Sequence, residues 1–209
     1  MFLSRIIVSR LIAWWKIEAK RPSNSPDVVV ATSYGTSESR LMVGTEACFR
    51  TALNISDSLD GVTIAFSNSD KNGGSHISDF EFSHKLGLMR DNSMLGKAIN
   101  VIFARPYRGA IEEILLIGDA ISLRIRNPKC LMVITGEILS PLTYKVYRKL
   151  FPNSEITIVT VPYEVEVQPD SPYFFRRGFV RWFVGNIAMR LALEFFSIKS
   201  ISKFFSDIA

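Results

Sequence analysis

A chain of 209 residues is long enough to form one domain with a hydrophobic core, and it needs no disulfide to hold that core together. Hydrophobic residues make up 47% of the chain and charged residues 22%, which excludes an intrinsically disordered protein. Two cysteines and two histidines are too few for a zinc site, so the sequence predicts no metal and a reducing, cytoplasmic compartment.

The net charge of +5 is concentrated at the two ends of the chain. Residues 2–21 hold five basic side chains and one acidic, and residues 176–203 hold six basic and one acidic. Residues 22–175, in contrast, hold 14 basic and 17 acidic side chains. Nucleic acid is therefore not an expected partner, since this central part also lacks an RNA-binding or zinc-finger motif.

Both ends combine their basic residues with Trp, Phe and aliphatic side chains, which is typical of amphipathic helices on an anionic membrane surface. The same helices would also suit packing on the domain or on a partner subunit. Arg10 interrupts the first apolar run and Arg190 the last, so neither reaches the roughly 18 to 20 uncharged residues of a membrane span. We expect a basic amphipathic helix in residues 1–21 and a basic aromatic helix in residues 171–209, with peripheral contact to the inner membrane as the alternative to packing.

Residues 22–170 alternate between apolar, β-branched runs and helical patterns. That order predicts an α/β domain, a three-layer Rossmann-like sandwich with a mostly parallel five-stranded sheet and helices on both faces. The expected strands are Val28–Thr32, Val62–Ser67, Ile99–Ala104, Leu131–Thr135 and Ile156–Val161. The expected helices are Arg40–Leu59, Ser78–Leu88, Ala110–Ile125 and Ser140–Leu150.

Local signals predict two of the helix starts. Ser78 and Glu81 have the spacing of a capping box, and Ser140 precedes Pro141 as an N-cap precedes a proline at the first helical position. Ligands of parallel sheets bind outside the carboxyl ends of the strands, where the strand order reverses. A reversal between the first and third strands would create such a crevice, and the strand order itself stays open.

Four stretches within residues 27–165 have the types and the order that a known protein family shows. They are the strand Val28–Ala31 followed by a polar loop and Arg40, the loop Ser67–Gly74, a helix start with Glu112, and Leu150–Pro152 before the last strand. This order resembles the YdcF/SanA/ElyC-like family, Rossmann-like domains of bacteria that are often tied to cell-envelope work. Glu137 stands where that family has a histidine. The resemblance implies a strand-end site that includes Arg40 and a role in cell-envelope or surface-polysaccharide metabolism.

The loop after the first strand offers Ser33, Gly35 and Thr36 as ligand-binding residues. Their hydroxyl and amide groups at a helix N-terminus suit a phosphate or another anion, although such loops also serve as ordinary helix caps. There is no Gly-x-Gly-x-x-Gly and no Walker A spacing. The cofactor therefore stays unknown, with nucleotide-like, S-adenosylmethionine-like and other anionic small molecules as the open classes.

The loop after the third strand adds Arg105 and Arg108, whose guanidinium groups can bind a phosphate or carboxylate through two hydrogen bonds each. Of the adjacent Glu112 and Glu113, only one faces the crevice, because neighbours diverge by about 100° around a helix. The catalytic candidates are Glu112 and Glu137, the latter as a general base if burial raises its pKa. The alternative assigns Glu112 to the helix dipole and Glu137 to a backbone amide in its loop.

Two functions of different classes remain. In the first, the domain binds a phosphate- or nucleotide-like small molecule at the strand ends, with or without turnover. It requires one pocket for Ser33, Arg40, Arg105, Arg108, Glu112 and Glu137. In the second, a non-catalytic module docks on a membrane or a partner through its basic aromatic ends, and these residues point apart or pair with one another.

Overall fold

The computed structural model of the chain describes residues 2–17, 22–36, 40–69, 75–91, 100–169, 174–198 and 200, and their side chains except at 2–5, 75–78, 174 and 175. Five strands form one sheet in the order β3-β2-β1-β4-β5, and all neighbouring pairs are parallel. The strands are β1 (Val28–Ala31), β2 (Thr63–Phe66), β3 (Asn100–Phe103), β4 (Cys130–Gly136) and β5 (Glu155–Val161). Each expected strand is present within one residue at either end, and the sheet is wholly rather than mostly parallel.

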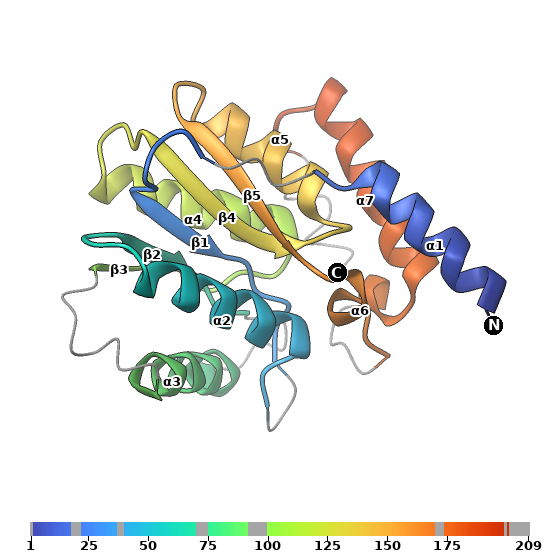
Figure 1. Cartoon of the computed structure of the whole chain (residues 1–209), viewed down its shortest axis with the longest axis horizontal. Coiled ribbons are helices and arrows are strands. Elements are labelled where there is room, and N and C mark those ends of the chain that lie inside the picture. Colours follow the sequence, from blue (N-terminus) through green and yellow to red (C-terminus); the bar gives the residue numbers. More distant parts are fainter. Residues whose placement is uncertain are drawn as a thin grey trace.

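Helices cover both faces of the sheet (Figure 1). They are α2 (Val43–Asp57), α3 (Ser75–Asp91), α4 (Ala110–Arg124) and α5 (Ser140–Leu150). Helices α2 and α3 lie on one face, and α4 and α5 lie on the other. The three-layer Rossmann-like sandwich predicted from the sequence is therefore confirmed.

The sheet interior explains why these runs form strands. All residues of β1, β2 and β4 are buried, and such strands, covered on both faces, consist of unbroken apolar runs. Strand order reverses between β1 and β4, which places the ligand-binding switch point of this fold there. The strand order, which the sequence leaves open, therefore has its reversal between the first and fourth strands, and β2 lies between β1 and β3.

Three predicted helix starts are wrong, for tertiary reasons. Helix α2 begins at Val43 rather than Arg40, because Leu41 pairs with Thr36 and closes the loop before the helix. Helix α3 begins at Ser75, three residues before the predicted cap at Ser78. The residue before α5 is Leu139, so Ser140 is the first helical residue instead of the N-cap.

The two ends of the chain form helices that lie side by side at one end of the sandwich (Figure 1). They are α1 (Phe2–Trp15) and α7 (Phe179–Phe195). The Trp15 ring meets Phe183 edge-on with 5.2 Å between ring centroids, and its Nε1 donates to the carbonyl of Ile138 at 2.9 Å. Between β5 and α7 lie two short helices, α6 (Tyr163–Glu166) and the 3₁₀ helix η2 (Phe174–Arg177). In the described part of the chain, no helix has the length and hydropathy of a membrane span.

Candidate functional site

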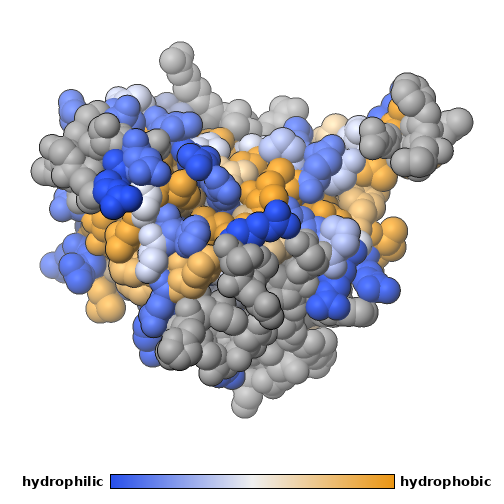
Figure 2. All heavy atoms as spheres, turned by 90° about the horizontal axis from the view of Figure 1, so that it is seen from below, coloured by the Kyte–Doolittle hydropathy of each residue, from blue (hydrophilic) through white to orange (hydrophobic). Residues whose placement is uncertain are grey.

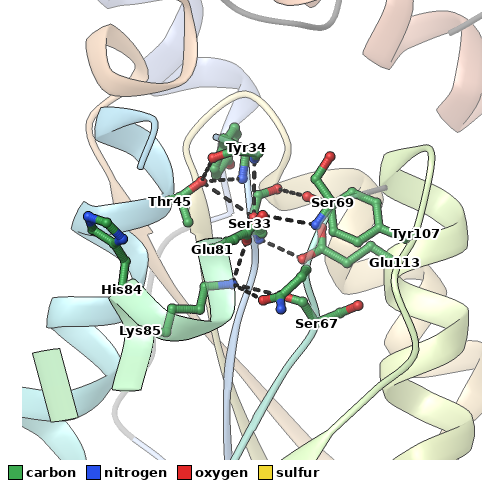
Figure 3. Close-up of polar contacts among 12 residues, drawn as sticks. Ser33, Tyr34, Thr45, Ser67, Ser69, Glu81, His84, Lys85, Tyr107 and Glu113 are labelled. Atoms are coloured by element: carbon green, nitrogen blue, oxygen red, sulfur yellow. Dashed lines mark hydrogen bonds and ion pairs between the residues drawn. The ribbon is translucent and has the colours of Figure 1, made fainter. Parts of the chain in front are cut away.

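Buried charge gathers at the carboxyl edge of the sheet. Among the described residues, five charged side chains are at most 2% exposed: Glu81, Lys85, Glu113, Glu166 and Arg176. The first three form what we call the strand-end cluster, together with the side chains of Ser33, Thr45, Asn68 and Tyr107 and the backbone carbonyl of Ser67. Figure 3 shows the labelled members of this cluster lying together, at the ends of β1 and β2, on α2, α3 and α4, and in the loop after β3.

The first feature of the strand-end cluster is a buried ion pair on α3. Lys85 Nζ lies 2.7 Å from Glu81 Oε1, and their side chains are 1% and 0% exposed. Lys85 Nζ also donates to the carbonyl of Ser67 at 2.6 Å and to Asn68 Oδ1 at 3.3 Å. Because the two residues are one helical turn apart, α3 presents both charges on its buried face.

Glu81 connects this ion pair to the loops after β1 and β2. Its Oε1 accepts a hydrogen bond from Ser33 Oγ at 2.5 Å, and its Oε2 accepts one from the backbone N–H of Ser69 at 2.9 Å. This inward position explains why Glu81 does not complete a capping box with Ser78, whose side chain lies outside the described residues. One carboxylate therefore fixes the loops after two strands.

The second feature is Glu113, in the first turn of α4. Its Oε1 accepts a hydrogen bond from the backbone N–H of Ser33 at 2.5 Å. Within the described part of the chain, its Oε2 has no hydrogen-bond partner although it is buried. Burial raises the pKa of Glu113 to about 8, against the opposing effects of the Ser33 hydrogen bond and of the charge of Lys85. A carboxyl group with such a pKa exchanges a proton near neutral pH.

Tyr107 links the loop after β3 to the same cluster. It is fully buried, its hydroxyl donates to the carbonyl of Ser33 at 2.9 Å, and its backbone N–H donates to the carbonyl of Asn68 at 2.9 Å. On either side of it, Arg105 and Arg108 are exposed. The loops after β1, β2 and β3 thus form one connected unit, with basic side chains on its outside.

The predicted ligand-binding residues of the first loop lie in or next to the cluster. Ser33 belongs to it, and Gly35 adopts a positive φ of 85° that favours glycine. The carbonyl of Gly35 accepts a hydrogen bond from Thr45 Oγ1 at 2.7 Å. Thr36 is buried and pairs with Leu41, whereas Arg40 is exposed at the start of the next segment.

The two predicted catalytic residues have other partners. Glu112 Oε2 accepts a hydrogen bond from the backbone N–H of Arg108 at 2.7 Å, so it serves the N-terminus of its own helix. Glu137 pairs with Lys16 at 2.7 Å and accepts a hydrogen bond from the Tyr163 N–H at 3.1 Å, and neither partner belongs to the strand-end cluster. Their catalytic roles stay predictions.

Two surface hollows lie outside the cluster. One of about 450 Å³ is at the amino edge of the sheet, around Asn127 and Phe151. The other, of about 420 Å³, lies between β3 and α4, and Arg105 lines it together with Asp119 and Arg124. Of the predicted site residues, Arg105 alone lines either hollow, so neither hollow is the single pocket that the first function was expected to form.

Comparison with known proteins adds no relative: no family model matches the chain, and neither a curated protein nor a solved structure matches it. The resemblance to the YdcF/SanA/ElyC-like family stays a prediction. The assignment of the candidate site therefore rests on the geometry of this chain.

Proposed function

We propose that the domain binds an anionic small molecule, of phosphate- or nucleotide-like chemistry, at the carboxyl ends of β1, β2 and β3. The observation that carries this proposal is the burial of Glu81, Lys85 and Glu113 at the edge where parallel sheets bind ligands. A buried ion pair adds little or nothing to stability compared with well-packed apolar residues. Ionisable groups buried together at such an edge are typical of functional sites.

The loops supply the charge that such a ligand needs. Arg105 and Arg108 are exposed on the loop that Tyr107 ties to Ser33, and guanidinium groups bind phosphate through paired hydrogen bonds. Glu113, which binds the backbone N–H of the same Ser33 and has its pKa raised to about 8, is suited to accept or donate a proton. The arrangement supports binding by the arginines and, where turnover occurs, proton transfer by Glu113.

The test is a thermal-shift measurement with a panel of nucleotides, sugar nucleotides and S-adenosylmethionine. A ligand at a hundredfold excess over its Kd stabilises the folded state by about 2.7 kcal/mol. We expect one class to stabilise the wild type and the control Arg50→Ala, an exposed arginine on α2 that pairs with Glu46, but not the double variant Arg105→Ala/Arg108→Ala. An equal shift in the double variant, or no shift with any compound, contradicts the proposal.

A specific observation favours a second function, docking on an anionic membrane surface. Helix α7 buries one face, yet a second apolar stripe along it is exposed: Val180, Val184, Leu191 and Phe195, at 70%, 55%, 57% and 81%. On the neighbouring α1, Ile7 and Trp14 are 62% and 78% exposed. Figure 2 shows apolar surface near the edge of the molecule where Figure 1 places these two helices. We call these six residues the docking stripe.

Charge decides the kind of surface that suits the docking stripe. Arg10 on α1 and Arg181 on α7 are exposed beside it, and apolar and aromatic side chains flanked by cations suit anionic headgroups. Sedimentation with phosphatidylglycerol vesicles tests this function. We expect binding by the wild type and by Leu123→Ser, which removes an equally exposed leucine from α4, and lost binding in Leu191→Ser/Phe195→Ser. Equal binding by the double variant contradicts it.

A further inference from the structure

The switch point between β1 and β4 is occupied by a carboxylate of the chain itself. Glu166, the last residue of the four-residue helix α6, is 1% exposed and lies against the end of β4. A Cβ atom at Gly136, the last residue of β4, would lie 1.9 Å from Glu166 Cδ. Only glycine therefore leaves room at this position for the carboxylate.

Donors from three parts of the fold surround the Glu166 carboxylate. Its Oε1 accepts a hydrogen bond from the backbone N–H of Ile138 at 2.7 Å. Its Oε2 accepts hydrogen bonds from the backbone N–H of Leu139 at 3.2 Å, from Trp182 Nε1 at 3.0 Å and from the Tyr34 hydroxyl at 3.4 Å. Backbone N–H groups at the start of a helix, here α5, form a natural anion site, and two side-chain donors complete this one.

A buried cation adds charge to the same place. The Arg176 guanidinium is 4.3 Å from the centroid of the Tyr34 ring and 4.7 Å from that of Trp182, the two rings whose polar atoms donate to Glu166. The side chain of Arg176 is 2% exposed. Burial raises the pKa of Glu166 to about 7, against the opposing effects of its hydrogen bonds and of the Arg176 charge. Hydrogen-bond donors, the buried Arg176 cation and a space that fits a carboxylate thus lie together at this point.

From this arrangement we infer that the β1/β4 switch point is a second ligand site, specific for a small carboxylate, which the chain itself fills with Glu166. Three of the four donors belong to the core of the fold, at the end of β1 and between β4 and α5. The occupant comes from a short helix beyond the last strand, and Trp182 and Arg176 follow it in the chain. One donor binds Oε1 of Glu166 and three bind Oε2, so the donors are arranged around the two oxygens of a planar carboxylate rather than around a tetrahedral phosphate. An external carboxylate would have to displace Glu166.

Chemical rescue tests this inference. In Glu166→Ala the site loses its occupant, so we expect the melting temperature to fall and then to rise with increasing sodium formate or acetate, recovering at least half of the loss. Wild type and Glu164→Ala, which removes the exposed carboxylate of the same helix, should not respond beyond a sodium chloride control at equal ionic strength. Phosphate forms the second arm of the experiment, and we expect it to restore less than formate.

The result that overturns the inference is a melting temperature of Glu166→Ala that formate and acetate change no more than that of wild type. An equal or larger effect of phosphate overturns the assignment to carboxylates. If Glu166→Ala is unfolded without additives, the folded fraction measured by circular dichroism replaces the melting temperature, and failure of formate to restore it also overturns the inference. The arginines of the strand-end loops are unchanged in this variant, so the outcome is independent of the function proposed above.

Discussion

Lys85 and Glu81 are opposite charges that the fold has removed from water together. Removing one partner leaves the other charge buried without compensation, which typically costs about 3–5 kcal/mol. We therefore expect Lys85→Met to lower the free energy of unfolding by about that amount, as measured by urea denaturation. The double variant Glu81→Gln/Lys85→Met should lose less than Lys85→Met alone, because no uncompensated charge remains.

A matched pair on the surface provides the control. Glu46 and Arg50 are also one turn apart and 2.7 Å from each other, but their side chains are 42% and 51% exposed. Replacing Arg50 by Met should cost only about 0.3–0.5 kcal/mol. Equal losses of unfolding free energy in Lys85→Met and Arg50→Met would show that burial does not set the energy of the Glu81–Lys85 pair.

The raised pKa of Glu113 predicts that the stability of the folded protein depends on pH. Its pKa is raised to about 8 in the folded state, so between about pH 4.5 and about pH 8 the folded protein holds a proton that the unfolded chain has lost. Stability from this group is therefore complete at low pH and falls as the pH rises through this window. Glu166, with its pKa raised to about 7, acts in the same direction.

The variant Glu113→Gln isolates the first of these contributions. We expect urea denaturation to give a smaller loss of stability between about pH 5 and about pH 8 for this variant than for wild type, because Gln cannot ionise. Glu112→Gln, a change at the neighbouring position, should keep the wild-type slope. The same slope in Glu113→Gln and wild type would contradict the raised pKa of Glu113.

At the residue scale, the sequence predicts part of the candidate site. Ser33 follows the first apolar strand directly, so its position at the carboxyl edge follows from chain order. The prediction that one of two adjacent glutamates faces inward is also correct, but the inward residue is Glu113 rather than Glu112. The signal lies in the apolar spacing of α4, since Glu113 is one turn before the buried Ile117. Lys85 is missed because a helix-face lysine is normally solvated.

At the element scale, α6 docks on β4 through a contact that permits no side chain at Gly136. An alanine there forces α6 or β4 to move, and overpacking of this kind typically costs about 1–3 kcal/mol. We expect Gly136→Ala to lose about this much stability in thermal or urea unfolding. Gly87→Ala is the control, because open space surrounds Gly87 in α3 and alanine favours a helix by about 1 kcal/mol. Unchanged stability of Gly136→Ala would contradict the tight docking of α6.

The strands are predicted well and the helix starts poorly, for a physical reason. A strand covered on both faces must be apolar throughout, so the pattern is visible in the sequence alone. A helix start depends on partners elsewhere. Ser140 Oγ accepts a hydrogen bond from the Ile17 N–H at 3.0 Å and donates to the Glu137 carbonyl at 2.9 Å, instead of capping its helix. Local spacing contains no information about Ile17, which lies far away in the chain.

At the scale of the whole molecule, basic charge and exposed apolar surface coincide on the terminal helices. If the docking stripe contacts anionic lipid, Arg10→Glu changes the charge near the surface by two, and each charge contributes about 1 kcal/mol. We expect vesicle binding to weaken roughly 30-fold at about 0.1 M salt, and much less at about 1 M, where the Debye length is about 3 Å.

The control for this experiment is Arg126→Glu, which changes the net charge equally but lies after α4, away from the docking stripe. Its vesicle binding should stay close to that of wild type. Equal weakening in both variants would assign the effect to net charge rather than to the terminal helices.

The strand order also belongs to this scale, and the sequence does not predict it. Apolar runs define which segments are strands, but the order depends on which helix crosses which face of the sheet. The position of the switch point, and with it the place of Glu166, is therefore known only from the folded chain. The same limit explains why the sequence leaves the strand order, and with it the place of the crevice, open.

The order β3-β2-β1-β4-β5 has a consequence for the growing chain on the ribosome. Strand β1 needs β4 as its second neighbour, and the hydrogen bond from the Cys130 N–H to Asp27 Oδ2 already spans 103 positions. Until β4 has left the exit tunnel, the most central strand of the finished sheet is an open apolar edge, a form prone to aggregate. We expect nascent chains that stop before β4 to depend on chaperones, and the sheet to close in one late step.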